Sequence, residues 1–193
     1  MPRDAVVKVH HVCTFSLSML LLASLPAAAQ GGAMSVYTDL DLEQCLVLDA
    51  DDFGASWSCP GYRGYPLLVE EGDLRFSLRY GFNIDQNSVG FQTLPPFNHL
   101  REKLEWRLSN VSGRFLPVAT IVRYFTAPPA GEGEDGQVLV VTQIKEGESC
   151  HIAYIDARAN ANANELARQA ADNAGEFDCA NDEVEIIGAF AAY

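Results

Sequence analysis

Residues 1–29 have the pattern of a secretory signal peptide, which constrains the fold because it decides which residues fold and in which compartment. Two basic residues precede an apolar run at residues 12–25, and Pro26 with three alanines follows it. A run of about 14 residues is short for a membrane span. The alternatives are a buried core helix or a membrane anchor. We expect cleavage after residue 29, a periplasmic or secreted single domain at residues 30–193, and no stable membrane anchor.

Cysteine content is the second constraint, because an exported chain folds where thiols are oxidised. Cys13 leaves with the signal peptide, and an even number remains: Cys45, Cys59, Cys150 and Cys179. A zinc site typically has cysteine pairs about two to four residues apart, and these cysteines are much farther apart in the sequence. A C-x-x-C redox pair is also missing from this set. We therefore expect structural disulfides and no metal site.

A local hairpin selects one of the three connectivities that four cysteines allow. A turn-rich segment around Asp52 lies between two apolar runs, which predicts a hairpin centred there. That hairpin places Cys45 opposite Cys59 and Val47 opposite Trp57. Cross-strand partners lie close enough for a disulfide. The predicted bridges are Cys45–Cys59 and Cys150–Cys179.

Period-two alternation of apolar and polar residues predicts a strand-rich fold. In residues 74–80, Leu74, Phe76, Leu78 and Tyr80 alternate with polar side chains, which is typical of a half-buried strand. Alternation also predicts strands at 104–108 and 115–127. The other expected strands, from extended or β-rich composition between turns, are 36–40, 43–48, 57–59, 65–70, 137–144 and 149–157. We expect one mainly antiparallel sheet of roughly seven to nine strands.

One helix is expected late in the chain, at residues 163–174. Its apolar positions, mostly alanine, recur at i, i+3 and i+4. Asn162 and Glu165 resemble a capping box, and Gly175 is placed to end the helix. An alanine face lies close to a sheet but buries little area, so we expect the Cys150–Cys179 bridge to help hold the helix. The expected fold class is α+β, with one late Ala-rich helix and two disulfides.

The net charge of −13 restricts the partners that this chain can bind. Nucleic acids and anionic membrane surfaces would repel such a chain, because phosphate contacts supply most non-specific binding. A basic partner is compatible with the charge, although acidity also serves solubility alone. The expected partner is an unknown protein or small ligand, with no nucleic acid.

Nucleophilic catalysis has little support in the sequence. After the signal peptide only His99 and His151 remain as histidine bases, and no G-x-S-x-G elbow is present. The cysteines are better assigned to disulfides. We therefore expect no catalytic triad and no cofactor.

Paired carboxylates are the alternative, because an exported glycan hydrolase places two acids beside aromatic platforms. Glu105 beside Trp106, and Asp73 near Tyr80, could take that role. With so many acidic residues, however, some pair always fits. We expect Glu105 on the solvent-facing side of a strand with Arg107 as its neighbour.

An Asp-rich turn raises the question of calcium. Asp49, Asp51 and Asp52 cluster in the first hairpin, with Asp39 and Asp41 nearby. The segment lacks the spaced ligands and closing glutamate of an EF-hand loop. A plain turn is the favoured interpretation.

Two sets of side chains are candidates for binding. Arg75 and Arg79 share one strand face, where they could hold an anion together with Arg107 or Arg123. The alternative is a simple surface pair between Arg75 and Asp73. The second set is an aromatic surface, with a core position as the alternative for each residue. It comprises Trp57, Trp106, Tyr62, Tyr65, Tyr124 and Phe125. His99 joins the candidates because it follows Pro95 and Pro96 in the long segment of residues 81–99.

Two stretches resemble a family of small exported bacterial proteins of unknown function. They are Asp49…Trp57-Ser-Cys59-Pro-Gly61…Gly64…Glu71-Gly-Asp73-Leu-Arg75…Gly81 and Cys150-His-Ile-Ala-Tyr-Ile-Asp156-Ala157 with Asn164-Glu-Leu166-Ala167-Arg168 and Phe177-Asp-Cys179. The resemblance covers most of residues 30–193. It implies export and paired cysteines, and it assigns no catalytic or binding residue.

These patterns favour a periplasmic, non-enzymatic interaction module. Its binding surface would be a sheet face or the loop of residues 81–99, because long loops in compact domains are often functional. The alternatives are a carboxylate-based hydrolase acting on cell-envelope material and a structural envelope factor. An enzyme would have a deep pocket with two acids, whereas a binding module would have an apolar or aromatic patch.

Overall fold

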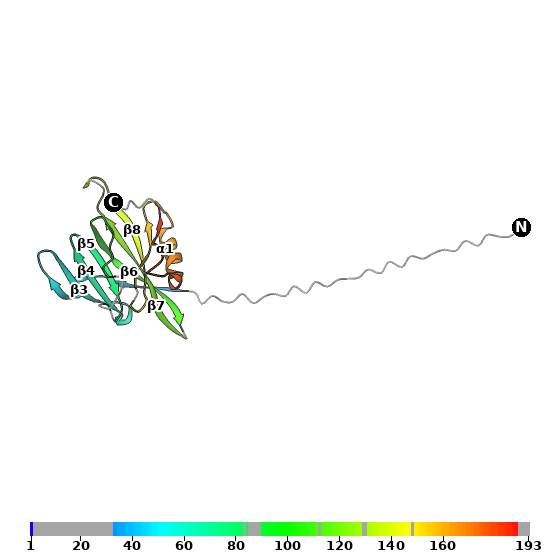
Figure 1. Ribbon diagram of the computed structural model, residues 1–193, viewed down its shortest axis with the longest axis horizontal. Helices are drawn as coiled ribbons and strands as arrows, with labels where there is room; N and C mark the ends of the chain where they lie inside the picture. The colour runs from blue at the N-terminus through cyan, green and yellow to red at the C-terminus, as the bar shows by residue number, and fades with distance from the viewer. Residues whose placement is uncertain are drawn as a thin grey trace. The chain divides into compact units, whose positions relative to one another are not determined.

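Two β-sheets and one helix make up the fold in the computed structural model (Figure 1). The structure describes Met1 and residues 33–82, 84, 90–111, 113–128, 131–147 and 149–188. Residues 2–32 lie outside this set, so the predicted signal peptide of residues 1–29 is outside the described residues apart from Met1.

The larger sheet has six strands in the order β1-β6-β7-β8-β9-β10. Their bounds are β1 Met34–Asp39, β6 Asn98–Val111, β7 Arg114–Thr126, β8 Gly136–Gln143, β9 His151–Asp156 and β10 Glu185–Ile187. β10 pairs with β9 in parallel, and the other pairs are antiparallel.

The smaller sheet has four antiparallel strands in the order β2-β3-β4-β5. Their bounds are β2 Leu46–Ala50, β3 Gly54–Pro60, β4 Pro66–Gly72 and β5 Arg75–Tyr80. The prediction of a single sheet is therefore wrong. The alternation along each strand gives its buried face but does not give the strands with which it pairs.

The six-stranded sheet lies between the four-stranded sheet and the helix, as the labelled elements in Figure 1 show. One core joins the two sheets, with Val69 and Leu78 packed among Trp106 and Tyr124. A second core lies on the opposite face, where Ile121 and Ile155 meet the helix. Because both faces of the six-stranded sheet are covered, β8 in its centre is buried from Val138 to Gln143.

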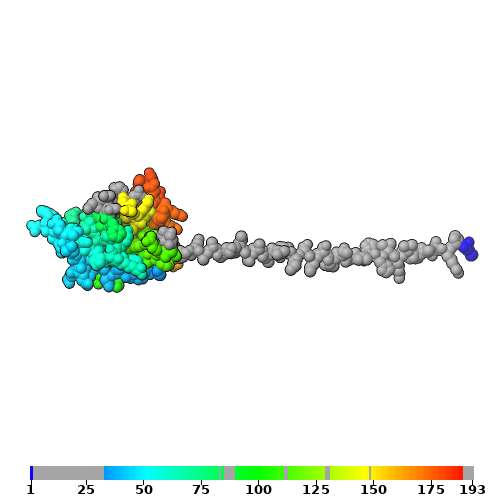
Figure 2. All heavy atoms as spheres, turned by 90° about the horizontal axis from the view of Figure 1, so that it is seen from below, coloured from blue at the N-terminus to red at the C-terminus, as the bar shows by residue number. Residues whose placement is uncertain are grey.

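The first hairpin confirms the predicted pairing and corrects its centre. Cys45 and Cys59 form a disulfide with a Cα–Cα distance of 4.6 Å, and Val47 lies opposite Trp57. The register shifts between Val47 and Asp49, so Leu48 is an extra residue of a β-bulge and the turn moves toward Gly54. Figure 2 shows the β2–β3 hairpin, in cyan, projecting from the body formed by the other described elements.

Two local predictions in this region are wrong. Residues 43–48 are not one extended segment, because Leu42–Gln44 forms a 3₁₀ turn that the Asp41 side chain caps by accepting from the Glu43 amide. Leu74 is not on the buried strand face. It lies in the β4–β5 turn with a φ of 58° and is 62% exposed.

Helix α1 spans Ala163–Asp172, and its buried residues are Ala163, Ala167 and Ala171. The predicted start is confirmed in position, because Asn162 is the N-cap residue, but its side chain makes no capping hydrogen bond. The predicted end is wrong, because the C-cap is Asn173 and the helix stops before Gly175. Gly175 instead lies inside a 3₁₀ turn, Ala174–Glu176. Among the described residues, no helix is long and apolar enough to cross a membrane.

The second disulfide, Cys150–Cys179, joins the start of β9 to the segment that follows α1, with a Cα–Cα distance of 5.9 Å. We predict that Cys150→Ser with Cys179→Ser destabilises the protein by about 2–4 kcal/mol. Hydrogen exchange should rise first in α1, because alanine contacts alone bury little area. The control is Cys45→Ser with Cys59→Ser, which should leave α1 protected. Unchanged protection of α1 in the first variant would contradict the prediction.

Candidate functional site

A pocket of about 820 Å³ opens where turns of the two sheets meet. The smaller sheet contributes the 3₁₀ turn Tyr62–Gly64 and the end of β5, and the larger sheet contributes the β6–β7 and β8–β9 turns. We call it the aromatic pocket. Its apolar lining is Met34, Tyr62, Tyr65, Tyr80, Phe82, Phe115, Leu116, Pro117 and Ile144.

Trp106 of β6 lies behind Tyr65 and Tyr80 and supports them; we call these two side chains the aromatic wall of the pocket. Its ring meets Tyr65 and Tyr80 edge-on, with centroid distances of 5.9 Å and 5.7 Å. The indole is fully buried, and its Nε1 donates to Thr38 at 2.9 Å. A Cβ at Gly61 would lie 2.5 Å from this ring, so only glycine lets the turn approach so closely. Trp106 and Gly61 together therefore fix the position of Tyr65 in the wall.

The mouth of the pocket exposes large apolar side chains to solvent. Phe82 is 77% exposed, and Met34, Phe115 and Leu116 are 42%, 43% and 40% exposed. Phe82 also packs edge-on against Tyr65 at 5.5 Å. Single exposed apolar residues are common on protein surfaces, but a group around one pocket is typical of a binding site.

Charged residues complete the lining. Arg63, Arg114 and Lys145 are cationic, and Glu146 is the one carboxylate among the described lining residues. Burial and the nearby Glu146 carboxylate raise the pKa of the Tyr65 phenol above its ordinary value. Tyr65 is therefore neutral at physiological pH and can act as a hydrogen-bond donor in the pocket.

The predicted arginine pair lies outside the aromatic pocket, and each arginine has its own partners. Arg75 pairs with Asp73, as expected, and its Nε donates to the Pro95 carbonyl at 2.7 Å. Arg79 forms a bidentate pair with Glu70, at 2.9 Å and 3.0 Å. These contacts already use the guanidinium donors that an anion would need.

Arg107 and Arg123 do not join that pair. Arg107 forms an ion pair with Asp172 of α1, and Arg123 donates to Gln137 at 3.0 Å.

The predicted aromatic candidates also separate. Trp57 stacks on Phe76 with a centroid distance of 6.4 Å, and His99 stacks on Phe125 at 5.0 Å. Trp106 is in the core, as is Tyr124. Of the predicted aromatic surface, only Tyr62 and Tyr65 line the aromatic pocket.

Glu105 is not on a solvent-facing side, which corrects the sequence prediction. It is 8% exposed and Arg107 is 6% exposed, because α1 covers this face of β6. Arg168 of α1 donates to Glu105 from Nε at 2.6 Å, and Arg107 donates from Nε to Asp172 at 2.8 Å. Alternation showed that this face was polar but could not show that a charged helix covers it.

Ser35 of β1 connects these two ion pairs. Its hydroxyl donates to Glu105 and accepts from Arg107 Nη1, the latter at 2.6 Å. The group serves to attach α1 and β1 to β6. Glu105 is therefore held by structural contacts and is not paired with Asp73, whose partner is Arg75.

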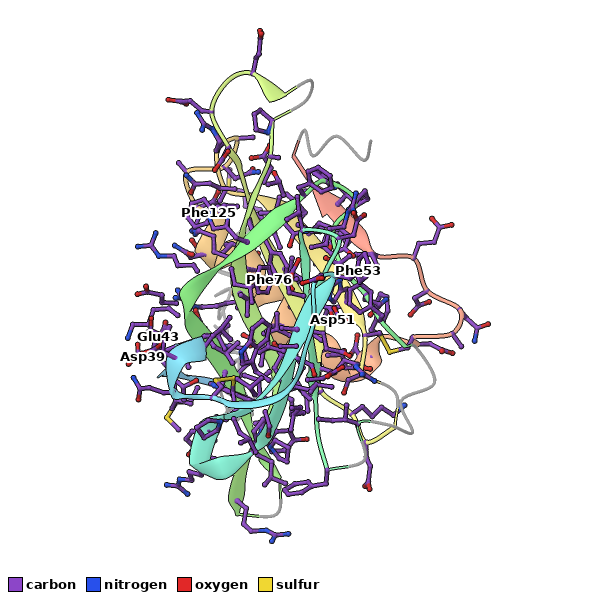
Figure 3. The ribbon with its side chains drawn as sticks, turned by 90° about the vertical axis from the view of Figure 1, so that its left-hand side faces the viewer. Asp39, Glu43, Asp51, Phe53, Phe76 and Phe125 are labelled. Atoms are coloured by element: carbon purple, nitrogen blue, oxygen red, sulfur yellow. A yellow bond between two sulfur atoms is a disulfide. The ribbon has the colours of Figure 1, made fainter. Side chains whose placement is uncertain are left out.

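The Asp-rich turn closes the first hairpin. Asp51 Oδ1 accepts from the backbone amides of Phe53 and Gly54, at 2.7 Å and 3.1 Å. Asp39 pairs with Lys103, and Figure 3 shows Asp39 well apart from Asp51. Within the described ranges, no three histidine, cysteine, aspartate or glutamate side chains gather as metal ligands.

The loop of residues 81–99 contributes to the pocket only through its first residues, as far as the structure describes it. Gly81 and Phe82 line the pocket. Asn83 and residues 85–89 lie outside the described residues. Farther along, Leu94 is fully buried, and the Asn98 side chain donates to the Pro96 carbonyl at 2.9 Å. This end of the loop is therefore packed, and His99 already belongs to β6.

Sequence reasoning missed Arg63, Arg114, Phe115 and Leu116. Phe115 and Leu116 were assigned to a strand, and they do lie in β7, but near its solvent-exposed start. The available signal was the adjacent Gly113, which marks a turn beside two exposed apolar residues.

No protein-family model, no curated protein and no solved structure matches this chain.

The ion pair between Arg168 of α1 and Glu105 of β6 leads to a stability prediction. Arg168→Met should lower the free energy of unfolding by about 2–4 kcal/mol, because it leaves the buried Glu105 carboxylate without its cation. Urea unfolding measures this change. The control, Arg158→Met, breaks the exposed pair with Glu134 and should change the free energy of unfolding little, because solvent screens that pair. Equal losses in the two variants would show that Glu105 does not depend on Arg168.

His151 generates a pH prediction. Burial lowers its pKa to about 4, and the Tyr154 hydroxyl lies 2.8 Å from its Nδ1. An unfolded histidine titrates near pH 6.5, so the unfolded state binds more protons between about pH 6.5 and 4. Stability should fall as pH drops through this window, by up to ~1.4 kcal/mol per pH unit.

Urea unfolding at several pH values tests this dependence. His151→Gln should flatten the slope in that window, whatever it does to the stability at neutral pH. His99→Gln is the control and should keep the slope. A slope that survives in His151→Gln would assign the pH dependence to other groups.

Proposed function

We propose that this chain is an exported, non-enzymatic protein that binds a small molecule with an apolar body in the aromatic pocket. The observation that carries the proposal is the group of exposed apolar side chains, including Phe82 and Leu116, around a pocket with an aromatic wall. Small-molecule sites are typically concave and apolar, with a few polar groups that orient the ligand.

The preformed wall supports binding without a large conformational cost. Trp106 is fixed by its core position and by the hydrogen bond to Thr38. Tyr65 and Tyr80 are held against it by edge-on contacts. A ligand that enters this pocket meets side chains already in place, so little entropy is lost in ordering them.

Export is part of the proposal. The N-terminal pattern of residues 1–29 and the resemblance to small exported bacterial proteins support it. The two disulfides fit an oxidising compartment such as the periplasm. A mainly antiparallel α+β fold with one late Ala-rich helix is also part of the proposal, and the strand pairings and the buried alanines of α1 support it.

Fluorescence of N-phenyl-1-naphthylamine, an uncharged aromatic probe, tests the pocket directly. The purified, oxidised protein should bind the probe. Phe82→Ser with Leu116→Ser should weaken binding about tenfold or more, because each truncation removes apolar area from the contact.

A matched control uses exposed apolar residues outside the pocket. Leu46 and Phe53 of the first hairpin are 68% and 84% exposed. Leu46→Ser with Phe53→Ser makes the same chemical change and should leave probe binding within about twofold. If the two double variants bind the probe equally well, the aromatic pocket is not the binding site.

A further inference from the structure

Among the described arginines, two that line the aromatic pocket lack the ion-pair partners that most of the others have. Ion pairs hold Arg75, Arg79, Arg107, Arg158 and Arg168. Arg63 and Arg114 make no ion pair or side-chain hydrogen bond with any described residue. Both line the aromatic pocket.

From this arrangement we infer that the ligand of the aromatic pocket is an amphipathic anion. Its aromatic or alkyl body lies against Tyr65 and Phe82, and its carboxylate, sulfonate or phosphate head is bound by Arg63 and Arg114. The inference rests on the proposed function and adds the class of ligand.

The charge of the chain makes this local arrangement informative. With a net charge of −13, arginines have many carboxylates available as partners. Arg63 and Arg114 come from opposite sheets, one in the turn before β4 and one at the start of β7. Lys145 adds a third cation to the lining and Glu146 one carboxylate, so the described lining residues are net positive.

The backbone at Arg63 supports a binding role. Its φ is 51° and its ψ is 35°, a left-handed conformation that costs energy for any residue with a Cβ. Glycine adopts this conformation without steric cost and already occupies the next position, 64. The turn itself therefore does not require an arginine at position 63. The guanidinium also lies over its own neighbour, with Cζ 5.3 Å from the centroid of the Tyr62 ring. Strained non-glycine residues of this kind concentrate at functional sites.

Guanidinium chemistry matches an oxyanion head. Arginine presents parallel N–H donors that bind carboxylate, sulfonate or phosphate oxygens in a bidentate way. The apolar wall beside the arginines lowers the local dielectric, which strengthens the attraction relative to an open surface. A neutral ligand of the same shape would gain the apolar contacts only.

A pair of closely matched probes separates the two parts of the site. The sulfonate 1-anilinonaphthalene-8-sulfonate and the uncharged N-phenyl-1-naphthylamine share an aromatic body. Both are titrated against the purified, oxidised protein. The variants are Arg63→Gln, Arg114→Gln and the double variant.

The control double variant, Arg101→Gln with Lys103→Gln, removes the same charge from the opposite end of β6. We expect each pocket arginine variant to weaken sulfonate binding roughly three- to tenfold, and the double variant at least tenfold. Binding of the uncharged probe should stay within about twofold. Raising the salt from about 0.05 M to about 0.5 M should weaken only the sulfonate.

Arg63→Gly provides a second readout that a structural role would not produce. Glycine relieves the left-handed strain, so the variant should melt at the same temperature or higher while it loses affinity for the sulfonate. If Arg63→Gly both keeps its sulfonate affinity and melts lower, Arg63 has a structural role and the inference fails.

The remaining outcomes distinguish the two proposals. If the uncharged probe binds but the pocket arginine variants weaken sulfonate binding no more than the control does, the anionic ligand class is wrong and the proposed binding function stands. If neither probe binds the wild-type protein, both proposals fail.

Discussion

The structure depends on the middle of strand β6, residues 104–108, where the two faces carry opposite chemistry and are both buried. Trp106 on one face joins the two sheets and supports the aromatic wall. Glu105 and Arg107 on the other face are paired with α1 and joined through Ser35. Because neighbouring side chains point to opposite faces of a strand, a single short segment sets the positions of the smaller sheet, the helix and the pocket.

Local patterns predicted the cysteine pairing of the first hairpin and the helix, although not every turn and cap. The midpoint of the first hairpin gave the Cys45–Cys59 bridge and the Val47–Trp57 pair, since partners in a hairpin are fixed by the turn between them. Alanine spacing predicted helix α1. The division into two sheets and the burial of Glu105 were not predicted, because both depend on contacts between distant parts of the chain. The pocket was missed for the same reason, since its lining comes from separate turns.

The site combines an apolar wall with cations in an acidic chain. The two carboxylates considered from the sequence lie outside this site, where Glu105 pairs with Arg168 and Asp73 with Arg75. Our proposal for this site is recognition, with rigid aromatic rings for the body of a ligand and guanidinium groups for its head. The two disulfides, one at each sheet, fit an oxidising compartment for the proposed binding.

The mouth and the back of the aromatic pocket belong to different parts of the fold. The back rests on Trp106 in a fully buried strand position, whereas the mouth is built from turns and strand ends that carry little of the core. If the aromatic pocket binds a ligand as we propose, substitutions at its mouth change ligand preference with little effect on folding. A scaffold arranged in this way can be redirected toward new ligands, in evolution or by design, while its two sheets remain unchanged.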